Sequence, residues 1–176
     1  MYKRQEWTKT LKGKGDQIGK LVEKGKGDFV GPEISGKTLG IVGFGRIGQA
    51  LGRMAKGMGM NVIAFDIFHI PGIEEQTGIN YVEMDELLAK SDFISVHAPA
   101  VDGGAIINAA NIAKMKDGVV IINTSRGTNV DEAALLDALN SGKVYAAGLD
   151  VWAEEPSKNE ALYSLSLIHI SEPTRR

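Results

Sequence analysis

Three glycines with a fixed spacing occupy the stretch "LGIVGFGRIG", which follows an apolar run and opens a helical pattern. They are Gly43, Gly45 and Gly48, in the order GxGxxG. In such a turn the first glycine permits the tight bend, the second lets the backbone approach a diphosphate, and the third lets the helix pack on the strand. The amides of Arg46 and Ile47 would then face the diphosphate from the start of the helix. The spacing predicts a dinucleotide-binding turn.

A carboxylate ends the next apolar run, "NVIAFD", at Asp66. At this position an acid accepts hydrogen bonds from an adenosine ribose and repels a 2′-phosphate. The pattern therefore favours NAD over NADP. The alternative is a glycine-rich turn with an unrelated surface aspartate, which would bind no cofactor.

A guanidinium and an acid pair follow two later apolar runs. Arg126 lies in "TSRG", where a guanidinium could bind a carboxylate through two hydrogen bonds. Glu154 and Glu155 close "GLDVWAEE". Singly they could be a surface arginine and a solvated acidic turn. Together they follow the carboxyl ends of strands, where ligands bind in open α/β sheets, so we interpret them as one site.

These residues need a sheet that brings the ends of its strands together. Short apolar runs alternate with helical patterns along the chain. The predicted strands are residues 38–44, 61–66, 92–98, 118–124 and 144–150, and the predicted helices are 46–59, 84–91, 108–116 and 131–142. In the last helix, Asp131 is the expected N-cap and Gly142 the expected end. Near-continuously apolar strands alternating with helices predict an α/β fold with a doubly wound parallel sheet, the Rossmann arrangement.

The chain preceding this pattern is rich in glycine and lysine. We expect residues 6–36 to form a connecting helix and loop, and residues 37–164 to form the dinucleotide-binding domain. The lysines could instead make a phosphate or nucleic-acid surface. A solvated connecting segment is the preferred interpretation, because the net charge of −2 over 176 residues gives no general attraction to nucleic acid.

Composition narrows the class of protein further. The chain has no cysteine, which excludes disulfides and thiolate metal sites and is compatible with a reducing cytosol. No apolar stretch reaches the roughly 20 residues of a membrane helix. We therefore expect a cytoplasmic protein without a membrane or nucleic-acid partner and without a bound metal.

Four longer stretches resemble the D-2-hydroxyacid dehydrogenase family: "GKTLGIVGFGRIG", "SVHAP", "VVIINTSRGTNVDEAALLDAL" and "AAGLDVWAEEP". The lysine-rich lead into "FVGPEISGKTLGIVGFG" is most similar to the 3-phosphoglycerate dehydrogenase branch of that family. The resemblance implies that Arg126 binds the substrate and that Glu155 orients a catalytic histidine. It implies that Asp150 contacts the nicotinamide carboxamide. The residues that it places beside the cofactor are His97, Ala98, Pro99, Thr124 and Ser125.

The same resemblance implies the activity. It predicts hydride transfer between NAD(H) and a small 2-hydroxy acid, with 3-phosphoglycerate as the expected substrate and a homodimer as the expected assembly. Two alternatives stay open: a reductase of another 2-keto acid such as glyoxylate or pyruvate, and a non-enzymatic, NADH-sensing module like the co-repressors that share this fold. The family's substrate domain and its acid–base histidine have no counterpart in these residues.

His169 is not expected to be that histidine. The stretch "LSLIHISEPTRR", residues 165–176, reads as the translation of a transposon end and its adapter used in sequencing-library preparation. The opposite strand, read from a GTG start, encodes residues 1–5. We therefore predict that residues 1–5 and 165–176 are adapter-derived and that the rest is a fragment of a longer gene, inactive by itself.

Overall fold

A computed structural model of the chain describes residues 7–29, 31, 33–100, 103–155, 160–161 and 168–170. Its contacts divide the chain into two compact units, Met1–Glu33 and Ile34–Arg176. The first unit contains a single-turn 3-10 helix, Gly15–Gln17, then α2 (Ile18–Gly25) and a second 3-10 helix, Lys26–Phe29. No residue of α2 is buried.

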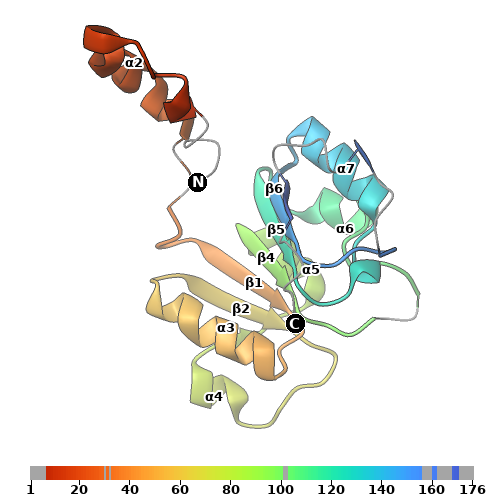
Figure 1. The fold of residues 1–176 in the computed structure, drawn as a ribbon. Coiled ribbons are helices and arrows are strands. Elements are labelled where there is room, and N and C mark those ends of the chain that lie inside the picture. The colour runs from red at the N-terminus through yellow and green to blue at the C-terminus, as the bar shows by residue number, and fades with distance from the viewer. Residues whose placement is uncertain are drawn as a thin grey trace. The chain divides into compact units, whose positions relative to one another are not determined.

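The second unit is built on one parallel sheet (Figure 1). Its strands lie in the order β3-β2-β1-β4-β5-β6-β7, so β1 has β2 on one side and β4 on the other. Their bounds are β1 Thr38–Val42, β2 Asn61–Phe65, β3 Asn80–Tyr81, β4 Phe93–Val96, β5 Val119–Asn123, β6 Val144–Leu149 and β7 Ile168–Ile170. The predicted doubly wound parallel sheet is confirmed, with its order reversing between β1 and β4.

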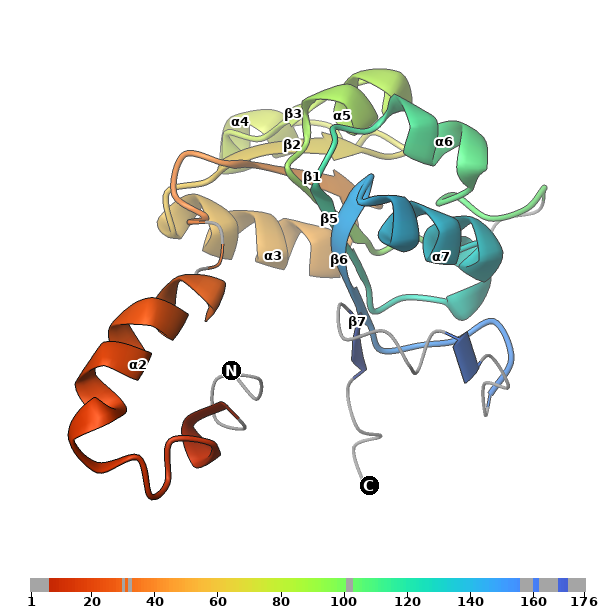
Figure 2. The same ribbon diagram turned by 90° about the horizontal axis from the view of Figure 1, so that it is seen from above.

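Helices cover both faces of this sheet. They are α3 Arg46–Gly57, α4 Ile73–Thr77, α5 Met84–Lys90, α6 Ala109–Lys114 and α7 Glu132–Ser141. In Figure 2, α3 lies on one side of β1 and β2 and α5 lies on the other. Two buried apolar clusters correspond to these layers, one including Ala55 of α3 and the other including Leu87 of α5, Ile112 of α6 and Leu135 of α7.

The N-cap and the terminating glycine predicted for α7 are both found in the structure. The Asp131 carboxylate accepts hydrogen bonds from the amides of Ala133 and Ala134 at 3.0 and 3.1 Å. Gly142 ends the helix in the left-handed region, at φ 79°. Leu135 and Leu139 are buried. These interactions fix where the chain turns back to form β6.

Four elements of the second unit were not predicted: α4, the two-residue strand β3, the 3-10 helix Gly127–Asn129, and β7. The pairing partners of β7 lie on β6, where Ala147, Gly148 and Leu149 are in register with residues 168–170. A short run with two isoleucines suits the open edge of a parallel sheet. The adapter origin of residues 165–176 stays a prediction. Among the described residues, every helix is too short or too polar to cross a membrane.

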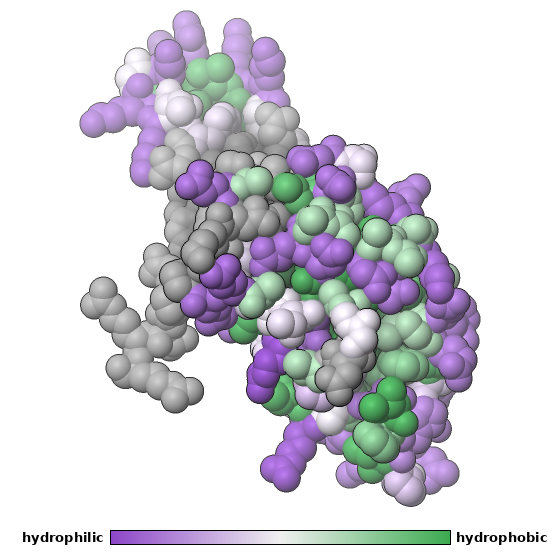
Figure 3. Space-filling model, turned by 90° about the vertical axis from the view of Figure 1, so that its right-hand side faces the viewer, coloured by the Kyte–Doolittle hydropathy of each residue, from purple (hydrophilic) through white to green (hydrophobic). Residues whose placement is uncertain are grey.

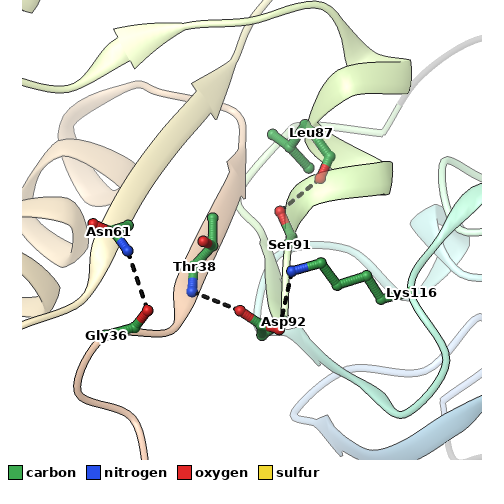
Figure 4. A network of polar contacts seen from close by, with 7 residues as sticks. All are labelled: Gly36, Thr38, Asn61, Leu87, Ser91, Asp92 and Lys116. Atoms are coloured by element: carbon green, nitrogen blue, oxygen red, sulfur yellow. Dashed lines mark hydrogen bonds and ion pairs between the residues drawn. The ribbon is translucent and has the colours of Figure 1, made fainter.

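At the end of the sheet where the strands begin, Asp92 joins three of them (Figure 4). Its carboxylate accepts from the amide of Thr38, the first residue of β1, at 2.8 Å, and from Lys116 Nζ at 3.1 Å, before β5. Partial burial would raise the pKa of Asp92, but the hydrogen bonds from Thr38 and Lys116, together with the charges of Lys116 and Lys37, lower it overall. The ionised form therefore stabilises the fold.

Asp92→Asn should lower the free energy of unfolding at pH 7 by about 1 kcal/mol, because the charge-assisted hydrogen bonds weaken. A carboxyl with a lowered pKa in the folded state stabilises above its unfolded pKa and loses this contribution as pH falls. The difference between wild type and variant, measured by urea unfolding, should therefore shrink below about pH 4. As a control, Asp117→Asn breaks an ion pair to Lys143 in which the aspartate is 90% exposed, and should cost under about 0.5 kcal/mol. Equal effects of the two changes would contradict the role of Asp92.

Candidate cofactor and substrate site

The glycine turn between β1 and α3 packs tightly on one side and is open on the other. Gly43 has φ +94°, and a Cβ there would lie 2.7 Å from the Ala98 amide nitrogen, so the turn rests against the backbone that follows β4. A Cβ on Gly48 would collide with the Gly43 carbonyl oxygen. A Cβ on Gly45 would meet nothing within 4 Å. The first and third glycines therefore serve packing, while the second borders free space.

That free space lies at the start of α3. Gly45 is the N-cap residue and supplies no side-chain hydrogen bond to the helix. The first amides of a helix have no partner within it, so those of Arg46 and Ile47 are suited to bind an anion. Both residues are exposed. An uncapped helix start in front of an open glycine turn fits the diphosphate of a dinucleotide.

Asp66 lies at the mouth of the same turn, directly after β2. Its Oδ2 accepts from the Phe44 amide at 2.7 Å, and its Oδ1 accepts from the Phe68 amide at 3.0 Å. These two bonds fix the carboxylate between the glycine turn and the chain that follows β2. Each oxygen has a second lone pair, so the group can still accept hydrogen bonds from ribose hydroxyls.

A cavity of about 410 Å³ opens beside Asp66 at the carboxyl ends of β1, β2 and β4. Six predicted cofactor residues line it: Gly43, Gly45, Asp66, His97, Ala98 and Pro99. Much of its wall is apolar, including Ile67, Phe68 and Ile70. Ile67 and Phe68 are each 75% exposed, and Figure 3 shows a face of the chain where hydrophobic side chains gather at one end. A cavity with one carboxylate, at the point where strand order reverses, suits the adenosine half of a dinucleotide.

His97 is half-buried in this cavity, and its Nε2 lies 2.9 Å from Ser95 Oγ. Burial lowers the pKa of His97, because the charged imidazolium is poorly solvated there. The ring is therefore neutral at pH 7. It lines the cavity beside Asp66, and its contact with a cofactor stays a prediction.

Tyr81 is a residue of this site that the sequence did not indicate. Its ring stacks on His69, with centroids 4.0 Å apart, and meets Phe44 edge-on at 5.6 Å. Its hydroxyl accepts from the Ile70 amide at 3.3 Å. Tyr81 thus holds the cavity wall from the short strand β3. His69 is exposed.

The predicted substrate residues follow β5 and β6, at the same edge of the sheet. Arg126 is exposed, and its Nη1 donates to the Ser125 carbonyl at 2.8 Å. Thr124 is exposed and Ser125 is half-buried. The Asp150 amide donates to the Asn123 carbonyl at 3.0 Å, which ties the end of β6 to the end of β5.

The turn after β6 packs directly on the Arg126 loop. A Cβ on Gly127 would overlap the backbone of Trp152. Glu155 Oε1 accepts from the Trp152 amide at 3.2 Å, so this acid is fixed within the same turn. The structure therefore gathers Arg126, Asp150 and Glu155 at one corner. Pro156 lies outside the described residues, and within the described part no group of three acidic or histidine side chains could hold a metal ion.

Residues 5–171 match the family described as "D-isomer specific 2-hydroxyacid dehydrogenase, NAD binding domain". The chain belongs to this family. The cofactor expected from Asp66 and the glycine turn is accordingly NAD.

Curated relatives in this family differ in the acid they are named for. A hydroxypyruvate reductase of Blautia hydrogenotrophica is 53% identical over 129 residues, covering 73% of this chain and 40% of the relative. A D-3-phosphoglycerate dehydrogenase of Mycobacterium leprae is 46% identical over 142 residues, covering 80% of this chain and 27% of the relative. The chain thus spans less than half the length of these 2-hydroxyacid dehydrogenases.

Solved structures of the family have the same fold. A glyoxylate reductase from Paecilomyes thermophila superposes with a TM-score of 0.74 and is 44% identical. The match covers 80% of this chain and 43% of that one. Three relatives with three different named acids show the family firmly, and they leave the particular substrate open.

Proposed function

We propose that this domain serves a D-2-hydroxyacid dehydrogenase that transfers a hydride between NAD(H) and a small 2-hydroxy acid. The observation that carries the proposal is the placement of Arg126. This exposed guanidinium follows β5 at the same sheet edge as the Asp66 cavity, and the turn that carries Glu155 packs on the next residue, Gly127. When bound, the cofactor supplies or accepts the hydride at its nicotinamide ring.

The residues of this chain would bind and orient the reactants. The amides of Arg46 and Ile47 would neutralise the diphosphate, and Asp66 would accept hydrogen bonds from the adenosine ribose. Arg126 would hold the α-carboxylate and polarise the neighbouring carbonyl oxygen. Glu155 would orient an acid–base histidine that lies outside these residues, since His97 is committed to the cavity wall.

The substrate that we propose is a short 2-hydroxy acid, with 3-phosphoglycerate as the first candidate. Relatives named for hydroxypyruvate and glyoxylate make these 2-keto acids the other candidates. The homodimer implied by the resemblance and the cytoplasmic location expected from the composition also stay predictions. Sedimentation of the full-length protein would test the first of these.

Fluorescence titration of this chain tests the cofactor half of the proposal. NADH should bind at least about tenfold more tightly than NADPH, because Asp66 repels a 2′-phosphate. Asp66→Asn should reduce that preference. No detectable binding of NADH by the folded chain would contradict the proposal.

The substrate half needs a protein of the relatives' full length. With a panel of 3-phosphoglycerate, hydroxypyruvate, glyoxylate and pyruvate, one acid should give the highest kcat/KM with NAD(H). Arg126→Gln should then lower kcat/KM for that acid by at least about 100-fold, as removal of an electrostatic contact to the reacting group does. A full-length protein inactive on every acid of the panel would reject the dehydrogenase assignment.

A further inference from the structure

Two asparagines on either side of Arg126 are completely buried. Asn123 ends β5 and Asn129 closes the 3-10 helix Gly127–Asn129, and each has an exposed fraction of 0%. Burying an amide side chain costs free energy unless its polar atoms find partners. Their hydrogen bonds show what these two amides hold.

Both asparagines bind the backbone of Arg126. Asn123 Nδ2 donates to the Arg126 carbonyl at 2.9 Å, and the main-chain N–H of Asn129 donates to the same oxygen at 3.1 Å. Asn123 Oδ1 accepts from the amide and the hydroxyl of Ser125 at 3.1 and 2.8 Å. The main chain of Ser125 and Arg126 is therefore held by buried hydrogen bonds, although the Arg126 side chain itself is exposed.

The side chain of Asn129 reaches in a second direction. Its Nδ2 donates to the Ala98 carbonyl at 2.9 Å and to Ser125 Oγ at 3.1 Å. Ala98 lines the cofactor cavity, and Ser125 precedes Arg126. One buried amide nitrogen thus joins the loop after β4 to the loop after β5.

The amide oxygen of Asn129, Oδ1, makes no comparable contact. Among the described residues, Asn129 Oδ1 is the buried side-chain polar atom without a hydrogen-bond partner. An unpaired buried oxygen destabilises a fold, and an apolar side chain of the same size avoids that cost. The contribution of the Asn129 side chain is therefore confined to the two hydrogen bonds that its nitrogen donates.

We propose that Asn129 is a positioning residue that sets the cofactor loop, His97 to Pro99, against the loop of Arg126. It contacts no ligand itself and acts through Ala98 and Ser125. The position of the cofactor loop relative to the Arg126 loop then depends on one amide nitrogen, Asn129 Nδ2. This inference rests on the proposed function, because it assumes that the Ala98 loop binds NAD(H).

Asn129→Leu in this chain separates positioning from stability. Leucine has a similar volume and removes both donated hydrogen bonds together with the unpaired oxygen. The Kd for NADH should rise about tenfold, while the chain stays folded in the absence of urea. The midpoint of urea unfolding should fall, because the Ala98 carbonyl and Ser125 Oγ each lose a donor. The emission of bound NADH, which reports the surroundings of its nicotinamide ring, should shift toward that of free NADH.

Asn61→Leu is the matched control. Asn61 Nδ2 also donates to a backbone carbonyl, that of Gly36 at 3.1 Å, but at the opposite end of the sheet (Figure 4). This variant should keep the wild-type Kd and emission. If Asn129→Leu does not fold, Asn129→Ser serves instead. Its shorter hydroxyl cannot reach both acceptors, so NADH affinity should also fall, but by less than about tenfold.

Wild-type Kd and emission in Asn129→Leu would overturn the proposal. So would wild-type emission of bound NADH in Asn129 variants that have lost stability and affinity, which would indicate a structural role only. Failure of the wild-type chain to bind NADH is a separate outcome, because it would contradict the proposed function before Asn129 is tested.

Discussion

Gly45→Val is expected to abolish detectable NADH binding while leaving the domain folded. Gly45 has φ −73°, which any residue can adopt, and a Cβ there meets no atom within 4 Å. The valine side chain would fill the space in which the diphosphate approaches the start of α3. The Kd should rise at least about 100-fold, whereas the free energy of unfolding should fall by no more than about 1 kcal/mol, the usual cost of a poor N-cap residue.

Gly48→Ala provides the opposite control within the same motif. Its Cβ would collide with the Gly43 carbonyl oxygen, so the helix must move away from the strand. This variant should lose about 2 kcal/mol or more of stability, as overpacked cores do. Calorimetric titration with NADH and urea unfolding of both variants distinguish the two roles. Normal NADH affinity in folded Gly45→Val would show that the dinucleotide does not bind at this turn.

The contrast between these glycines shows how far the sequence could predict the site. Local signals were sufficient for the glycine turn, for the strands that read as apolar runs, and for the Asp131 cap of α7, because each depends on neighbours in the chain. The placement of Asp66 also followed, since in a parallel sheet the end of β2 must lie beside the end of β1.

Residues whose partners are distant in sequence could not be found in this way. Tyr81 is on a two-residue strand, too short to give a pattern, and its contacts with Phe44 and His69 exist only in the folded sheet. Asn129 appears in the sequence as one polar residue in a polar turn. Its complete burial, and its bond to Ala98 across 31 positions, depend on β4 and β5 being adjacent. Residues that join two loops are the ones that only the fold reveals.

Gly127→Ala is expected to have the second large effect, on the substrate corner. The backbone of Trp152 crosses so close to Gly127 that a Cβ cannot fit between them. Since both elements there are main chain, neither can yield by a change of rotamer. The turn that carries Glu155 must therefore move away from the Arg126 loop, at a cost of about 2–3 kcal/mol in the free energy of unfolding. Urea unfolding followed by tryptophan emission measures this loss, because Trp152 lies at the contact.

Gly148→Ala controls for the loss of a glycine in the same region. Its Cβ would lie 3.8 Å from the nearest atom, a side-chain carbon of Ile122, which is ordinary contact within β6. This variant should be as stable as wild type to within about 0.5 kcal/mol. If Gly127→Ala were equally harmless, the turn after β6 would not be fixed to the Arg126 loop. Glu155 and Arg126 would then need another element to bring them together, and the substrate corner described here would not be one preformed unit.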